Sequence, residues 1–473
     1  MTETLPRRRA RVPRPTREER AAAGRAVRHH VPLTTHAGLA TEGRADPVEL
    51  LESQAVSRLP ELVPIRYGRM IGSPFAHYRG SALIMASDVA CSPHSGLEVQ
   101  LCGDAHMSNF GFYATPERRL VFDINDFDET HPGPFEWDVK RLAASLAVAG
   151  RDNGYSRKKR RRIIQGCAAG YRRAMIELAG QGNLTVWYSH LDADGVLREV
   201  RAQLDARRRS STKVALDKAR RKDSLQALAK LTTVVDGHPR ILNQPPLLVP
   251  VEDLVSVEEA RTTYESLEGL VRSYGRTLQR DRRQLLDQFA LVQMARKVVG
   301  VGSVGTRAWI ILFEGIDSGD PLFLQAKEAQ PSVLSGFVKA GPIRHQGARV
   351  VTGQQLMQAT SDIFLGWQRV PGPDGVDRDF YLRQLRDGKG SVVVEGMLPD
   401  AMALYGRLCG ETLARAHARS GDRVAIAAYL GSSDRFDNAI VDFAETYADQ
   451  NERDHEALIR ASRSGRVTAL AGI

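Results

Sequence analysis

Two short polar segments contain the residue types best suited to chemistry in this chain. Asp104 and Asn109 lie five residues apart in a loop, directly after a run of alternating apolar and polar residues. A second run follows a short hairpin and contains Asp123, Asp126 and Asp128. A carboxylate can accept or orient a hydroxyl proton, while amide and carboxylate oxygens can hold magnesium on a triphosphate. This layout predicts an ATP- and Mg²⁺-dependent phosphoryl transfer.

Each of these residues has its own role under this hypothesis. Asp104 accepts or orients the proton of the attacking hydroxyl, while Asn109 and Asp123 hold Mg²⁺. Asp126 is a further metal ligand and Asp128 a reserve, because the run offers more oxygen ligands than one ion needs. The alternative explanation for these acids is a set of turn-forming residues.

Three neighbours are expected to support the loop. His106 could contact phosphate, but we expect it to brace the loop. Asp138, near the start of a predicted helix, is expected to bond backbone groups of the loop. For Cys102 we expect a packing role.

The second half of the chain supplies the parts that would handle phosphate. Gly300, Gly302, Ser303 and Gly305 lie in a turn between two runs with strand character. Because a strand follows the turn, it resembles the flap that covers phosphates in kinases, and not a dinucleotide-binding fingerprint. Lys327 ends a later apolar strand, where a kinase keeps the catalytic lysine that neutralises the nucleotide phosphates.

These parts occur in an unusual order along the chain. The first 139 residues contain no lysine, so a phosphate lysine cannot precede Asp104 unless Arg69 or Arg79 replaces it. We therefore predict a circular permutation, with the catalytic lobe first and the glycine-loop lobe second. This arrangement would place Lys327 across a cleft from Asp123, with the glycine turn above.

The acid that pairs with Lys327 is not evident from the sequence. A predicted helix offers Gln354, Gln355 and Asp362, and Glu328 is adjacent but faces the other way on a strand. The lysine therefore has no identified counter-ion at this point.

The motifs resemble those of known families. The segment 103–109 with Asp123 is similar to the catalytic loop and metal aspartate of aminoglycoside phosphotransferase-like kinases. The segment 136–143 is similar to the acidic helix start that follows in that family, and 408–417 is similar to the helix that precedes its catalytic loop. The chain also resembles an uncharacterised bacterial family, domain of unknown function 2252, over residues 46–460, through the segments 103–111, 123–129, 300–306, 325–329 and 447–450.

The resemblance implies an α+β, protein-kinase-like, two-lobed fold in circularly permuted order, with a mostly helical large lobe and a small antiparallel sheet lobe. We expect a disordered basic tail at 1–45, a helical catalytic lobe at 46–290, a sheet lobe at 291–395, and C-terminal helices at 396–473 that pack back on the catalytic lobe. The acceptor pocket is expected among helices between residues 140 and 290.

Hydrophobic periodicity predicts the individual elements. Helices are expected at 137–149, 157–178, 211–231, 257–294, 353–364 and 401–420. Strands are expected at 97–101, 120–123, 306–314, 322–326 and 380–385.

Composition limits the partners. The net charge of +10 is concentrated in four basic runs, and aromatic residues, only 6% of the chain, do not interleave with them. Nucleic acid is therefore not an expected partner. No apolar run is long enough to span a membrane, no secretory signal is evident, and the four cysteines are scattered, so we expect a cytoplasmic protein with reduced thiols. The basic runs are 7–20, 157–162, 207–209 and 220–222.

Two other classes of function remain open. One is a non-catalytic nucleotide-binding regulator on a kinase-like scaffold, which the missing counter-ion of Lys327 favours. The other is a metal-dependent phosphoesterase, because the combination of Gly103, Asp104 and His106 also occurs in two-metal phosphatases. The acceptor, a small molecule or a protein, is not identified, and nucleotidyl transfer is also possible.

Overall fold

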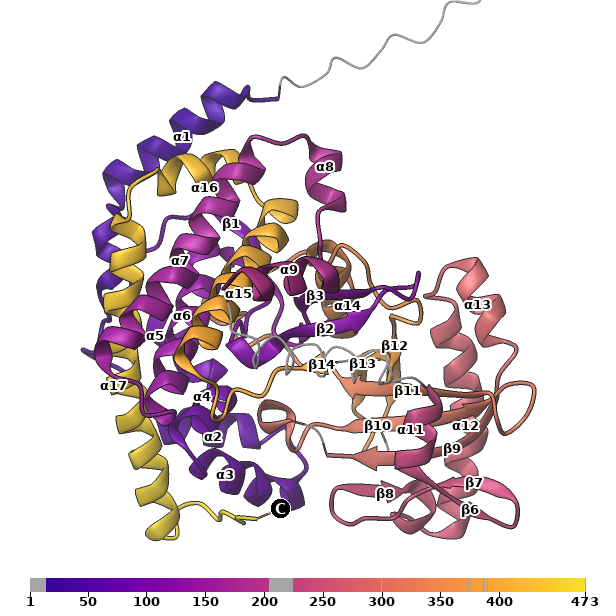
Figure 1. Ribbon diagram of the computed structural model, residues 1–473. Coiled ribbons are helices and arrows are strands. Elements are labelled where there is room, and N and C mark those ends of the chain that lie inside the picture. Colours follow the sequence, from indigo (N-terminus) through magenta and orange to yellow (C-terminus); the bar gives the residue numbers. More distant parts are fainter. Residues whose placement is uncertain are drawn as a thin grey trace, which may run out of the picture.

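The computed structural model describes residues 14–203, 224–298, 300–339, 341–372, 374–385, 388 and 390–472. A helical part lies beside a part built on a sheet (Figure 1), so the fold is mixed α+β. Outside the described residues lie the first 13 positions, two basic runs (207–209 and 220–222) and most of the helix predicted at 211–231. No described helix is long and apolar enough to cross a membrane.

The helical part is built around α6 (Phe135–Asp152), which is buried along almost its whole length. Apolar residues occupy most of its sides, so it suits the centre of a bundle. It packs against α7 (Arg157–Ala179), α15 (Pro399–Ser420) and α17 (Arg435–Arg463). The predicted helices at 137–149, 157–178 and 401–420 are confirmed. The remaining described helices of this part are α1 (Arg17–His30), α2 (Pro47–Ala55), α3 (Val63–Ile71), α4 (Pro74–Gly80), α5 (Ala82–Ala90), α8 (Asn183–Tyr188), α9 (Ala193–Gln203) and α16 (Arg423–Leu430).

Part of the segment predicted as a disordered tail is an ordered helix. A capping box between Thr16 and Glu19 begins α1, and these paired bonds satisfy N–H groups that a helix start leaves free. The helix packs on α16, where a Cβ at Gly24 would lie 2.1 Å from the carbonyl oxygen of Ala425. The prediction of disorder is therefore wrong from Arg17 onward.

Short strands hold the two polar loops. The strand β1 (Glu98–Leu101) pairs with β4 (His131–Pro134), and β2 (Phe110–Ala114) forms an antiparallel hairpin with β3 (Leu120–Ile124). One loop therefore joins β1 to β2 and a second joins β3 to β4, so both end near the start of α6. The small strands β14 (Gly390–Ser391) and β5 (Leu191–Asp192) extend the hairpin on its two sides.

The second part contains a six-stranded antiparallel sheet with the order β12-β13-β11-β10-β9-β8. Side chains alternate along its strands, so Leu324 and Ala326 pack against a helix while Gln325 and Lys327 face the helical part. The six strands are β8 (Leu248–Pro250), β9 (Ala290–Lys297), β10 (Ala308–Glu314), β11 (Pro321–Glu328), β12 (Gly366–Pro371) and β13 (Asp377–Gln384).

Helices cover this sheet. The helix α12 (Val257–Gly275) packs on one face, together with α13 (Arg280–Leu286), and α11 (Ser224–Leu231) packs on the other. The single helix predicted at 257–294 is in fact two helices, α12 and α13, and the prediction is wrong at its end, because Ala290 begins β9. Residues 224–286 thus belong with the sheet and not with the helical part. The hairpin β6 (Thr232–Val235) and β7 (His238–Ile241) and the helix α14 (Gln346–Met357), which lies earlier than its predicted position at 353–364, complete this part.

Candidate active site

The first turn of α6 holds the loop between β1 and β2. Asp138 accepts hydrogen bonds from the backbone N–H groups of Cys102 (2.8 Å) and Gly103 (3.1 Å). His417 of α15 lies 3.2 Å from the same carboxylate. Gly103 has a φ of +84°, and a Cβ there would lie 2.1 Å from the carbonyl oxygen of Glu129, so only glycine fits. The prediction that Asp138 bonds the loop backbone is confirmed.

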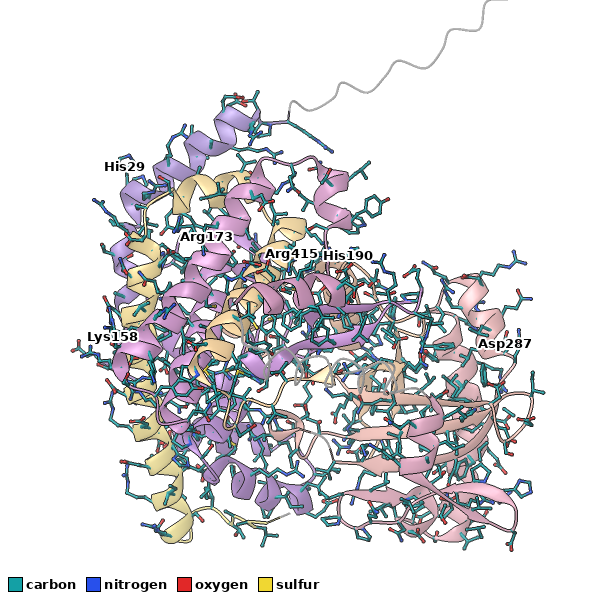
Figure 2. The ribbon with its side chains drawn as sticks, in the orientation of Figure 1. His29, Lys158, Arg173, His190, Asp287 and Arg415 are labelled. Atoms are coloured by element: carbon teal, nitrogen blue, oxygen red, sulfur yellow. The ribbon has the colours of Figure 1, made fainter. Side chains whose placement is uncertain are left out.

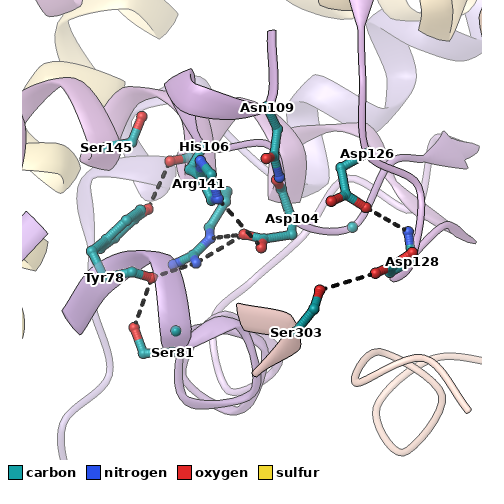
Figure 3. Close-up of polar contacts among 12 residues, drawn as sticks. Tyr78, Ser81, Asp104, His106, Asn109, Asp126, Asp128, Arg141, Ser145 and Ser303 are labelled. Atoms are coloured by element: carbon teal, nitrogen blue, oxygen red, sulfur yellow. Dashed lines mark hydrogen bonds and ion pairs between the residues drawn. The ribbon is translucent and has the colours of Figure 1, made fainter. Parts of the chain in front are cut away.

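Asp104 extends from this loop toward Arg141 (Figure 3). Nε and Nη2 of Arg141 both lie 2.9 Å from Oδ1 of Asp104, and the guanidinium lies over the Tyr78 ring at 3.9 Å. His106 is 3.6 Å from Oδ2 of Asp104, and burial lowers the pKa of His106 to about 4, so this imidazole is neutral at pH 7. The ion pair thus fixes Oδ1 of Asp104, while Oδ2 takes no part in it.

The loop between β3 and β4 brings Asp126 next to Asn109. The N–H of Asn125 donates to the carbonyl of Asn109 at 2.8 Å, and the Asn109 side-chain nitrogen donates to the carbonyl of Asp104 at 2.9 Å. Asp126 accepts from the N–H of Asp128 at 3.2 Å. Asp104, Asn109 and Asp126 consequently form one group (Figure 3), to which Asn109 contributes an amide oxygen and Asp126 a carboxylate.

Lys327 reaches the second loop from the sheet. Its Nζ lies 2.5 Å from Oδ2 of Asp128, and Tyr381, its register partner on β13, donates its hydroxyl to Oδ1 at 2.5 Å. The hydroxyl of Ser303 lies 3.4 Å from Oδ2 (Figure 3). Burial alone would lower the pKa of Lys327, but the carboxylates of Asp126 and Asp128 outweigh it and raise that pKa. Asp128 is therefore the counter-ion that the sequence leaves unidentified.

The glycine turn lies against the N-terminal helices. Residues Val301–Ser303 form a short 3₁₀ turn, and Val304 packs in an apolar cluster with residues in and just before α3. The N–H of Leu59 donates to the carbonyl of Gly305 at 2.8 Å. Gly305 therefore anchors the turn but does not line the cleft described below.

A cleft of about 460 Å³ between the two parts collects most of the predicted site residues. This volume is within the usual range for small-molecule sites. Within the described part of the chain, no residue between 130 and 296 lines it, so the expectation of a pocket built from helices at 140–290 is wrong for this cleft. The predicted residues that line it are Asp104, Asn109, Asp126, Gly300, Gly302, Ser303 and Lys327.

Asp123 lies away from this cleft. It is the penultimate residue of β3, and its carboxylate accepts from the N–H of Ile124 at 2.9 Å. Burial raises the pKa of Asp123, while Arg419 and Arg415 of α15 oppose that shift (Arg415 is labelled in Figure 2). The expected place of Asp123 opposite Lys327 is therefore wrong. The turn after the strand brings the later acids, and not Asp123, to the cleft.

Several residues that line the cleft or contact the side chains in it were not among the predicted site residues. Arg141 could have been found, because it follows Asp138 by three residues and so shares its helix face. Tyr381 lies on a strand between apolar neighbours. This alternation indicates which face of the sheet its side chain occupies, but not its role. Arginines from the N-terminal segment also line the cleft; they are Arg58, Arg66 and Arg79. Of the three, only Arg79 is predicted from the sequence, as a possible replacement for the phosphate lysine.

The donor set fits magnesium better than a two-metal centre. The described residues contain no group of three or more His, Cys, Asp or Glu side chains that could hold a metal ion. Mg²⁺ commonly binds one or two carboxylates together with substrate phosphates, and Asn109 with Asp126 can supply such a half-site. A two-metal phosphoesterase needs more protein ligands, so that alternative receives no support.

These features define a mixed α+β protein with a polar cleft between a helical part and a sheet part. The chain belongs to the family described as "Uncharacterized protein conserved in bacteria (DUF2252)", whose model matches residues 58–461. The match includes both polar loops, the glycine turn and Lys327. No curated protein and no solved structure matches the chain.

Proposed function

We propose that this protein is an ATP- and Mg²⁺-dependent phosphotransferase that acts on a hydroxyl of a small molecule or a protein. The contact between Lys327 and Asp128 is the observation that carries the proposal, because it joins the two halves of the chain in one cleft. That cleft also contains Asp104, Asn109 and Asp126. A kinase site needs these groups: a lysine for the phosphates, oxygen ligands for magnesium and an aspartate for the hydroxyl.

The order of elements in the sheet part supports a kinase-like fold. The glycine turn joins β9 to β10, Lys327 follows on β11, the third strand counted from β9, and α14 comes next. Protein kinases place a glycine-rich loop, a lysine on the third strand and a helix in the same order. Since the polar loops precede this lobe in the sequence, the arrangement also supports circular permutation.

The counter-ion of the lysine differs from that of kinases, where a glutamate of the helix after the lysine strand supplies it. Here Asp128 takes that place, and α14 acts on it through Arg349. This guanidinium donates to the carbonyl oxygens of Asp128 (2.9 Å) and Thr130 (2.6 Å) and so holds the backbone of the loop. The helix therefore positions the counter-ion without supplying it.

The residues then have distinct roles. Lys327 neutralises phosphate charge, and the oxygens of Asn109 and Asp126 would hold Mg²⁺, which supplies further charge neutralisation when bound. Oδ2 of Asp104 orients the acceptor hydroxyl. Gly302 lets the backbone approach the phosphates closely, because it has no side chain.

Calorimetry of ATP binding with and without Mg²⁺ tests the proposal. We expect the wild type to bind ATP, Lys327→Ala to bind it more weakly, and Asp126→Asn to lose the effect of Mg²⁺. Asp123→Asn is the matched control, because this acid is three residues away but outside the cleft, and it should retain the effect. Failure of the wild type to bind any nucleotide would refute the proposal.

A non-catalytic nucleotide-binding regulator is the second candidate. The ion pair with Arg141 favours it, because Oδ1 of Asp104 is already engaged by a guanidinium group. Turnover separates the two functions: ATP consumption that depends on Mg²⁺ and disappears in Asp104→Asn indicates an enzyme. Tight ATP binding without consumption in the presence of candidate acceptors favours the regulator.

A further inference from the structure

Three arginines of the N-terminal segment line the same cleft as Lys327 and Asp104. Arg58 follows α2, Arg66 lies in α3 and Arg79 lies in α4. The kinase-like roles above use none of them. Within the described residues, none of the three forms an ion pair with a carboxylate.

Arg58 and Arg66 are buried, Arg79 is half-buried, and the guanidinium group of each is incompletely bonded. Arg66 is 0% exposed; Nη2 donates to Gln54 (2.8 Å) and to the carbonyl of Gly80 (3.0 Å), but Nε and Nη1 have no partner. Arg58 is 8% exposed and donates to the carbonyl of Val304, but its Nε has no partner. The buried Nε of Arg79 also has none. Buried donors without acceptors are costly and rare.

Two other arginines with little solvent exposure have carboxylate partners. Arg44 pairs with Asp88 (2.7 Å) and Asp454 (2.6 Å), and Arg172 pairs with Asp437 (2.7 Å). Such pairing is the usual condition for burying a charged side chain. The three arginines of the cleft therefore lack the negatively charged partner that Arg44 and Arg172 have. A bound anion would supply it.

Their mutual repulsion strengthens this argument. Burial, and after it the charge of Arg58, lower the pKa of Arg66 well below its ordinary value. Burial likewise lowers the pKa of Arg58 to about 10, although the carboxylates of Glu129, Glu328 and Asp128 oppose the shift. Both shifts disfavour the charged guanidinium, so a bound anion would stabilise the charged forms of Arg58 and Arg66.

We propose that Arg58, Arg66 and Arg79 form a second phosphate-binding pocket in the cleft, separate from Lys327. The planar guanidinium fork matches phosphate oxygens, and all three side chains line the cleft. The glycine turn lies beside the pocket, since a Cβ on Gly302 would lie 3.2 Å from the carbonyl oxygen of Arg79. The inference rests on the proposed function only for the identity of the neighbouring nucleotide.

Two sources could supply this phosphate. It could be the terminal phosphate of the nucleotide, bound in the sense that suits nucleotidyl transfer. Otherwise it belongs to the acceptor, which would then be a phosphorylated molecule.

Calorimetry with inorganic phosphate and with ATP, each alone and in competition, tests the pocket and separates the sources. Phosphate should bind the wild type, and its affinity should fall about tenfold or more in Arg66→Gln and Arg79→Gln. If the pocket binds a phosphate of the nucleotide, inorganic phosphate should compete with ATP, and both substitutions should also weaken ATP binding. If the pocket binds a phosphate of the acceptor, inorganic phosphate should bind together with ATP, and the affinity for ATP should be unchanged in the two variants.

The matched control is Arg44→Gln, which removes a buried arginine outside the cleft. It should lower thermal stability, because it leaves two buried acids without their partner, but it should not change phosphate affinity. If Arg66→Gln fails to fold, Arg79→Gln carries the test, because Arg79 is only half-buried.

The proposed pocket would be refuted if phosphate did not bind to the wild type, or if it bound equally to all variants. Phosphate binding that depends on Arg66 or Arg79, without any ATP binding, would refute the proposed function and leave the pocket standing.

Discussion

Lys327 and Asp128 are in contact at 2.5 Å although 199 residues separate them in the sequence. The lysine side chain is 3% exposed and the aspartate 26%, so water screens this ion pair only in part. Tyr381 holds the other oxygen of Asp128, which fixes the carboxylate toward the lysine. The contact therefore links the helical part to the sheet part.

This buried pair should show strong energetic coupling. Asp128→Asn leaves a buried ammonium group short of its partner, so we expect the free energy of unfolding to fall by about 3 kcal/mol. Lys327→Met replaces the charge with an apolar chain of similar length and should cost about 1 kcal/mol or less. The double variant should cost clearly less than the sum, with a coupling of at least about 1 kcal/mol. Urea unfolding of the four proteins measures this cycle, and additive effects would contradict the coupling.

Arg141 should matter for turnover more than for nucleotide binding. It positions Asp104, which in the proposed function touches the acceptor and not ATP. We expect Arg141→Met to lower kcat about 100-fold or more, with KM for ATP little changed. Arg141→Lys should recover only part of the rate, since an ammonium group cannot reproduce the two guanidinium contacts.

The control for this variant is Arg151→Met on the same helix. Arg151 pairs with Glu445 (3.1 Å) and Asp449 (2.7 Å), far from the reacting groups in the proposed mechanism. The Arg151→Met variant should leave kcat unchanged when the rate is calculated per amount of folded protein. A similar loss of rate in both variants would indicate a general effect on α6 rather than positioning of Asp104.

The sequence was most informative where a local pattern determines local structure. Alternation before Asp104 predicts β1, and the spacing of apolar residues predicts α6, α7 and α15. The link from Asp138 to the loop backbone was also predictable, since a carboxylate in the first turn of a helix commonly accepts N–H bonds.

Register and long-range pairing were not predictable in this way. Asp123 and Asp126 are three residues apart in one acid-rich run, and only the end of β3 decides which of them reaches the cleft. The counter-ion of Lys327 comes from a loop that precedes it by 199 residues, so no helical or strand period connects them. Isolated arginines such as Arg66 can be recognised only from the structure, where the guanidinium group is buried and has no carboxylate partner.

Two glycines of the glycine turn should respond differently to alanine. Gly305 has a φ of +91°, and a Cβ there would lie 3.0 Å from Cβ of Arg58. Gly300 has a φ of −57° and open space around its would-be Cβ. We expect Gly305→Ala to lower the free energy of unfolding by about 1–3 kcal/mol and to weaken ATP binding, whereas Gly300→Ala should change stability by less than about 0.5 kcal/mol. Thermal unfolding with calorimetry tests this, and equal effects would contradict the assigned anchoring role of Gly305.

Glu129 should make the stability of the protein depend on pH between about 4.5 and 7. Burial raises its pKa from 4.5 to about 7, although the N–H of Val333 (2.7 Å) and the charge of Arg349 oppose the shift. In this window the folded protein keeps a proton that the unfolded chain has released. Since the folded state binds more protons, the free energy of unfolding falls as the pH rises through the window, by up to about 3 kcal/mol from this group.

The variant Glu129→Gln isolates this contribution, because glutamine keeps an oxygen for Val333 and does not titrate. Buried histidines also titrate, so the informative quantity is the wild-type free energy of unfolding minus that of the variant, measured in urea at pH 5, 6, 7 and 8. We expect this difference to decrease steadily to pH 7 and to level off above it. A difference that does not change with pH would show that Glu129 is ionised at low pH in the folded protein, and that the cleft is more polar around this residue than its burial implies.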